Sequence, residues 1–153
     1  MEIPIVQLRP PPIASDPMDD PGIEDYLLIP VIQIIDVTLA NVTSRGATEV
    51  VLEGIPNRTC EVRQKAGGQW QLIMRPPGKL LRALLRRLRF IADLKVESRV
   101  DQSSQFAVEI DGVIRVGFHI TFSSDEATGI TRAVLTILER SQLKRAQLYL
   151  VKS

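Results

Sequence analysis

Apolar residues recur at helical spacing in a first segment of the chain. The segment is bounded by Pro30, which suits a first helical turn, and by Gly46, which suits a helix stop. Between them, the positions spaced three or four apart are Val31, Ile34, Ile35, Thr38, Leu39 and Val42. This period is typical of a helix with one face buried. We therefore predict a helix over residues 30–45.

A second segment, "PPGKLLRALLRRLRFIADLK", carries the strongest periodic signal in the chain. Its apolar stripe consists of Leu81, Leu84, Leu85, Leu88, Ile91 and Ala92. Its basic residues fall mostly on the other face, and they are Lys79, Arg82, Arg86, Arg87 and Arg89. We predict a helix over residues 78–94 whose basic face is exposed to solvent or to a partner.

The remaining apolar residues follow strand-like patterns. The stretches "ATEVVLEG", "TCEVRQKA" and "QWQLIMR", with Gly67-Gly68 between the last two, predict a strand followed by a β-hairpin. Further strands are predicted for "QFAVEID", "VIRVGFHITFS", "ITRAVLTIL" and "AQLYLVK", which are rich in β-branched and apolar residues. The pattern favours an α+β fold, an antiparallel sheet with two main helices packed on one side.

The N-terminal part of the chain has a different composition. The stretch "QLRPPPIASDPMDDPG" is rich in proline and aspartate, which disfavour both helices and central strands. We expect residues 1–29 to form a flexible arm and residues 30–153 to form a single domain. The alternative for "RPPP" is a docking peptide for an aromatic-lined groove.

Charge and composition exclude several classes of function. The formal net charge is +1, which gives no general attraction to nucleic acid or to an anionic membrane. The basic helix could contact phosphates or lipid, but its polar face carries no aromatic residue that would stack on bases. Cys60 is the single cysteine and His119 the single histidine, and GxxxxGK[ST], HExxH and CxxC motifs are absent. We expect a cytoplasmic protein that is not an enzyme and has no metal site and no cofactor.

Three stretches of the chain resemble motifs of one known family. "IPVIQIIDVTLANVTSRGATEVVLEG" is similar to a family helix that leads into "RGASDIHIEP", and "RLRFIADLKVESRVDQSSQF" to "RIKxMAxLDIAERRxPQDGRF" with one residue fewer. "HITFSSD" and "VLTIL" are similar to "RVSTLPT" and "VLRIL". The family is that of the type II secretion and type IV pilus assembly ATPases, and the resemblance, from Pro30 to Leu138, is to the PAS-like domain preceding their motor domain. None of the motifs is intact.

The departures from the family pattern concern its phosphate-contacting residues. In the family, arginines of this domain reach the neighbouring motor domain and contact nucleotide phosphates. Of these positions Arg99 remains arginine, whereas Ser98, Gln105 and His119 replace the others. Neutral side chains do not stabilise a transferring phosphoryl group as a guanidinium does. The resemblance therefore implies a vestigial nucleotide-facing loop made of Glu97, Arg99, Gln102 and Gln105.

The resemblance implies a non-catalytic adaptor or regulatory binding domain of a type IV pilus or type II secretion-like assembly machine. Its partner is expected to be an assembly ATPase or an inner-membrane platform component. The residues expected to bind that partner are Arg86, Arg87, Arg89 and Arg99, because arginine is enriched at interface hot spots. One alternative is the regulatory N-terminal part of a longer hexameric ATPase. The other is a PAS-like module that senses a small ligand.

Overall fold

The computed structural model describes residues 4–8, 25–94, 101–110 and 114–142. Within these residues the chain forms seven strands, two α-helices and one short 3-10 helix. The elements follow in the order β1 (Ile5–Leu8), α1 (Asp25–Arg45), β2 (Glu49–Gly54), β3 (Glu61–Ala66), β4 (Gln69–Met74), η2 (Gly78–Leu80), α2 (Leu81–Ile91), β5 (Gln102–Ile110), β6 (Ile114–Ser124) and β7 (Thr131–Gln142).

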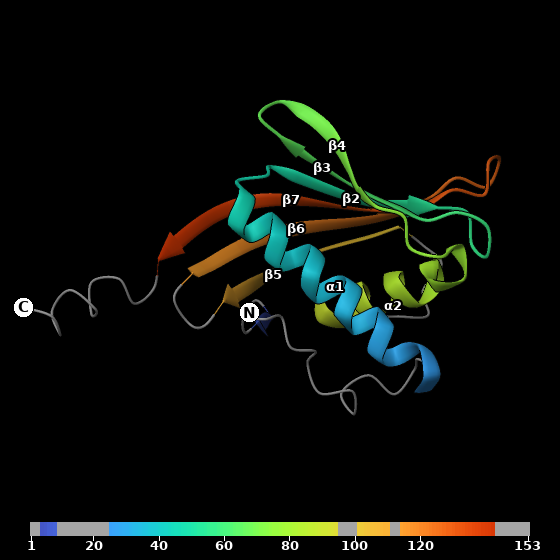
Figure 1. Ribbon diagram of the computed structural model, residues 1–153, viewed down its shortest axis with the longest axis horizontal. Helices are drawn as coiled ribbons and strands as arrows, with labels where there is room; N and C mark the ends of the chain where they lie inside the picture. The colour runs from blue at the N-terminus through green and yellow to red at the C-terminus, as the bar shows by residue number, and fades with distance from the viewer. Residues whose placement is uncertain (1–3, 9–24, 95–100, 111–113, 143–153) are drawn as a thin grey trace, which may run out of the picture.

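All the strands belong to one sheet with the order β1-β5-β6-β7-β2-β3-β4. Every neighbouring pair is antiparallel except β1 and β5, which run parallel. Both helices lie on the same side of the sheet (Figure 1). The predicted α+β class is confirmed, and so is the expectation of helices on one side. The sheet itself is mixed, which corrects the prediction of a wholly antiparallel one.

The core lies between the two helices and one face of the sheet. Along β6, every second side chain from Val116 to Phe122 is fully buried, while the intervening ones are half-buried on the other face. The ring of Phe106 on β5 stacks on that of Phe118, with centroids 5.2 Å apart. The alternation of side chains along the strands thus places the large apolar ones on the face that the helices cover.

Helix α2 follows the predicted apolar stripe. Leu81, Leu84, Leu85, Leu88 and Ile91 are all buried, as their spacing requires. Helix α1 also buries its predicted stripe except Ile34, which is half-buried. It begins at Asp25, five residues before the predicted start at residue 30. Because proline lacks an N–H, one carbonyl of the preceding turn has no helical bond, and a proline in a helix interior costs about 3 kcal/mol. The helix forms with Pro30 inside it, so the burial of its apolar side chains outweighs this cost.

Two parts of the chain that were expected to lack regular structure are in fact strands. Residues 5–8, assigned to a flexible arm, form β1 beside β5, and the amide of Ala107 donates to the carbonyl of Pro4 at 2.8 Å. Residues 102–104, assigned to a loop, form the start of β5, ahead of the strand predicted from residue 105. The rest of the predicted arm up to residue 24, and the strand predicted for "AQLYLVK", lie outside the described residues.

The C-terminal end of α1 is anchored to the sheet by Arg140 of β7. Its guanidinium donates to the carbonyl of Val42 at 3.2 Å and to that of Ala47 at 2.9 Å. A cation is favourable here because the last carbonyls of a helix carry partial negative charge and lack helical partners. Gly46 follows the helix with a φ of 72°, the left-handed conformation that the predicted stop requires.

A close approach of two backbone segments depends on Gly54 at the end of β2. The chain turns back over residues 55–60, where the hydroxyl of Thr59 accepts a hydrogen bond from the amide of Ile55 at 2.9 Å. A Cβ placed on Gly54 would lie 2.0 Å from the carbonyl oxygen of Thr59. Any larger residue must therefore move the backbone of this turn.

We predict that Gly54→Ala lowers the free energy of unfolding by about 2 kcal/mol, because overpacking against backbone cannot be relieved by a rotamer change. Urea denaturation would measure it. The matched control is Gly117→Ala, whose added Cβ meets side-chain atoms rather than backbone, Glu139 Cγ at 3.4 Å and Leu138 Cβ at 3.9 Å. Equal stability of the two variants would contradict the proposed close approach.

Candidate functional site

The predicted binding residues lie on α2 and β5. Arg86, Arg87 and Arg89 are on α2, and Gln102 and Gln105 are on β5. Glu97 and Arg99 lie outside the described residues. The structure thus allows the contacts of five of the predicted residues to be examined. It does not gather these five on one surface.

Arg87 is not on an exposed basic face. Only 2% of the residue is exposed, and its guanidinium carbon lies 5.2 Å from the centre of the Phe90 ring. The position follows from helix geometry, because Arg87 is three residues after Leu84 and four before Ile91, both of which are buried. The prediction that Arg87 is available to a partner is therefore wrong.

Arg89 connects α2 to two strands of the sheet. Its Nε donates to the side-chain oxygen of Gln102 on β5 at 3.0 Å, and its guanidinium carbon lies 4.4 Å from the centre of the Phe122 ring on β6. The side chain is half-buried, and burial lowers the pKa of its guanidinium. A cation held over an aromatic ring and bonded to an amide stabilises the packing of helix on sheet.

A second polar contact joins the same helix to the same strand. The hydroxyl of Ser104 donates to the carbonyl of Ala92 at 3.1 Å. Ala92 is the residue that ends α2, so this bond satisfies a carbonyl at the helix terminus. The resemblance places Gln102 in a nucleotide-facing loop. In the structure, Gln102 and Ser104 instead face α2 and bond to it.

Gln105 lies on the opposite face of β5. It is exposed and pairs in register with His119 on β6. His119 is half-buried, and its Nε2 lies 3.3 Å from the hydroxyl of Thr121. Because side chains alternate across a strand, Gln102 and Gln105 are on opposite faces and cannot contact one ligand together. The predicted loop is thus not a single surface in its described part.

Cys60 offers no reactive thiol in the folded protein. It is 3% exposed, and burial raises the pKa of its thiol to about 11, with the charge of Glu61 adding to the rise. A thiol with so high a pKa is neutral at physiological pH and a poor nucleophile. Across the described ranges, histidine, cysteine and carboxylate side chains form no group of three that could hold a metal ion.

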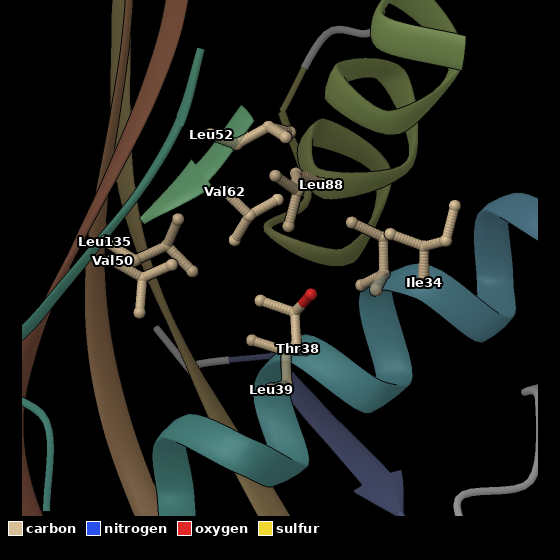
Figure 2. Close-up of a pocket in the computed structure, with 9 residues that line it drawn as sticks. Ile34, Thr38, Leu39, Val50, Leu52, Val62, Leu88 and Leu135 are labelled. Carbon is tan, nitrogen blue, oxygen red and sulfur yellow. The ribbon is translucent and has the colours of Figure 1, made fainter. Parts of the chain in front are cut away.

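A small cavity lies between α1, α2 and the sheet (Figure 2). It has a volume of about 20 Å³, whereas sites for drug-sized ligands measure roughly 300 Å³ or more. Its wall is lined by Ile34, Ile35, Thr38, Leu39, Val50, Leu52, Val62, Leu88 and Leu135. A cavity of this size holds little more than one water molecule. It therefore gives no support to a role in sensing a small ligand.

Thr38 is the polar residue in the wall of this cavity (Figure 2). It is 8% exposed, and its hydroxyl has no hydrogen-bond partner within the described part of the chain. A buried polar group left without a partner costs about 1–3 kcal/mol. The unpartnered hydroxyl of Thr38 thus lowers the free energy of unfolding of the domain.

The sequence patterns did not single out an exposed aromatic residue, Trp70. Trp70 on β4 is 47% exposed, and Leu72 two residues later is 45% exposed. A signal was present, since "QWQLIM" is a hairpin strand with no charged residue.

No helix in the described part is long and apolar enough to cross a bilayer.

Searches with the sequence against protein-family models and against curated proteins found no match. The resemblance to the secretion and pilus ATPases therefore stays a prediction.

We predict that Arg89→Glu lowers the free energy of unfolding by about 2 kcal/mol, because it removes the contact with Phe122 and places an acid beside Gln102. Arg82→Glu on the same helix is the matched control, because Arg82 is exposed and surface changes usually stay within about 0.5 kcal/mol. Chemical denaturation of both variants would test this. If Arg89→Glu unfolds at the wild-type midpoint, Arg89 has no role in packing.

We predict that Thr38→Val raises the free energy of unfolding by about 1 kcal/mol, because valine keeps the shape of threonine and removes the unpartnered hydroxyl. Thr38→Ala also removes a methyl group, enlarges the cavity and should lower stability by about 1 kcal/mol. Thermal and urea unfolding would distinguish the two. A loss of stability in Thr38→Val would mean that the hydroxyl is hydrogen-bonded in solution.

Proposed function

We propose that the chain is a non-catalytic adaptor or regulatory binding domain of a type IV pilus or type II secretion-like assembly machine. The observation that carries the non-catalytic part is the chemistry at two positions where the family has arginine. Gln105 and His119 occupy them here. Arg89, an arginine nearby on α2, is engaged with Phe122 and Gln102 within the domain itself.

The environment of the family's phosphate-facing positions supports the same proposal. Where the family has arginine, Gln105 is neutral and exposed, and His119 contacts a neighbouring threonine hydroxyl. Stabilising a transferring phosphoryl group requires positive charge aimed at its oxygens. A glutamine amide and an imidazole do not provide the planar guanidinium that binds two phosphate oxygens at once.

The three stretches that resemble the family fall on structurally connected parts of the domain. The first spans α1 and β2, the second runs from α2 into β5, and the third lies on β6 and β7. In the sheet, β5, β6, β7 and β2 are successive neighbours. A family domain that kept its fold and lost its phosphate contacts would retain such a set of packing elements.

The binding face is proposed to include the outer side of α2. Of the predicted residues, Arg86 is half-buried, and Lys79 and Arg82 nearby are exposed. These cations retain access to a partner, whereas Arg87 does not. Arginine suits such a contact because it binds carboxylates through two parallel hydrogen bonds.

The test of the adaptor function is affinity capture. The full tagged chain would be used to recover binding proteins from a lysate of its own cells, with Arg82→Glu as a folded variant altered on the proposed face. Recovery of an assembly ATPase or platform component, reduced at least tenfold by Arg82→Glu, is the expected result. Recovery of neither by the wild-type chain would overturn the proposal.

We also predict that the purified chain binds ATP no more tightly than about 1 mM and does not hydrolyse it, because no phosphate-binding loop is present in its sequence. Isothermal calorimetry with Mg-ATP and a phosphate-release assay would measure both. Micromolar binding would contradict the non-catalytic interpretation. An unfolded preparation would be recognised by circular dichroism before the titration.

A further inference from the structure

Strand β4 forms one edge of the sheet. In the described structure it pairs with β3 on one side and with no strand on the other. Its six residues, Gln69–Met74, include no charged residue and no proline. Sheet edges are usually protected by lysine, proline or a covering segment, because unpaired backbone groups bind other extended chains. Strand β4 contains neither lysine nor proline.

The face of β4 turned away from the helices is apolar. Trp70 and Leu72 pair in register with Lys65 and Arg63 of β3, whose neighbours Val62 and Gln64 point into the core. Trp70 and Leu72 are therefore on the uncovered face of the sheet, 47% and 45% exposed. The β3–β4 hairpin forms one end of the sheet, beyond β2 (Figure 1).

The uncovered face is polar toward the middle of the sheet. There Glu53 on β2 and Arg132 on β7 are direct cross-strand partners and form an ion pair of 2.7 Å. Such pairs are compatible with a solvated surface. Polar side chains thus occupy part of this face beside the apolar residues of β4. Leu138 on β7 is another exposed apolar residue of the sheet, at 51%.

The hairpin carries an excess of positive charge. Its one acid, Glu61, bonds to Arg63 at 2.6 Å and to Arg75 at 3.3 Å, and Lys65 adds a third basic residue. The side chain of Arg75, directly after β4, is 69% exposed. A second copy of the chain on this edge would bring two positively charged hairpins together, whereas an acidic partner would be attracted.

We propose that β4 is a docking edge for an extended segment of a partner protein, with apolar side chains beside Trp70 and Leu72 and acidic residues flanking them. The segment adds a strand to the sheet. Backbone hydrogen bonds to β4 hold the segment, and its alternate side chains give selectivity. Its flanking acidic residues are attracted by the positive charge of the hairpin. This proposal does not depend on the partner belonging to a secretion or pilus machine.

The chain offers its own reporter for this contact, because Trp70 is its only tryptophan. The probe is a synthetic peptide with the sequence EEVTVTVEE, acetylated and amidated at its ends, titrated into the purified full chain. We expect the fluorescence emission of Trp70 to shift to shorter wavelength as the ring is covered. The peptide KKVTVTVKK should bind at least tenfold more weakly, and so should EEVTVTVEE with its central amides N-methylated.

Two variants locate the contact. Leu72→Lys places a charge on the edge and should weaken binding of the acidic peptide at least tenfold, despite adding positive charge, because it blocks strand addition. Val37→Lys is the matched control, since Val37 is 46% exposed on α1 and receives the same charge. Its affinity for the peptide should equal that of the wild type.

Several results would overturn the proposal. These are an unchanged Trp70 emission up to millimolar peptide, equal binding of the N-methylated peptide, or equal binding by Leu72→Lys. A dimer in sedimentation equilibrium that Leu72→Lys dissociates would assign the edge to a second copy of the chain. Because the titration uses purified components alone, its outcome is independent of whether affinity capture recovers an assembly machine.

Discussion

The packing of two helices on a single face of the sheet constrains the rest of this structure. Phe106, Phe118 and Phe122 are fully buried on that face, and Arg89 of α2 lies over the ring of Phe122. Burying aromatic side chains is among the largest favourable contributions available to a domain of this size. Because one face receives the core, the other face and both ends of the sheet remain for contacts with solvent or with partners.

This arrangement explains why a helix with so many cations has few of them fully exposed. The apolar stripe of α2 is wide, so the arginines at its border also lie against the sheet. Arg87 is buried, and Arg89 is held over Phe122. Arginine tolerates such positions because its guanidinium stacks on rings and its stem is apolar. Charge on this helix therefore serves cohesion, and a count of its basic residues overstates the surface that is available for binding.

The sequence predicted those elements whose signal is local. The stripe of α2 and the hairpin around Gly67 were readable because periodicity and turn chemistry agree there. Residues 5–8 were not, because a four-residue strand next to a proline-rich stretch is stabilised by its pairing with β5, far along the chain. The start of α1 was missed because Pro30 was taken as a boundary, although packing tolerates it inside the helix. The contact of Arg89 with Phe122 depends on tertiary structure that helical periodicity alone does not contain.

The two ends of the sheet differ in how they can be used. At one end β1 runs parallel to β5. At the other, β4 belongs to a hairpin whose tip carries Gly67 and Gly68, both with positive φ, and no strand of the described residues pairs with its outer side. Trp70 lies outside the core cluster, and about half of it is exposed. An aromatic residue in this position supports the proposed docking edge, because aromatic residues are enriched where proteins bind one another.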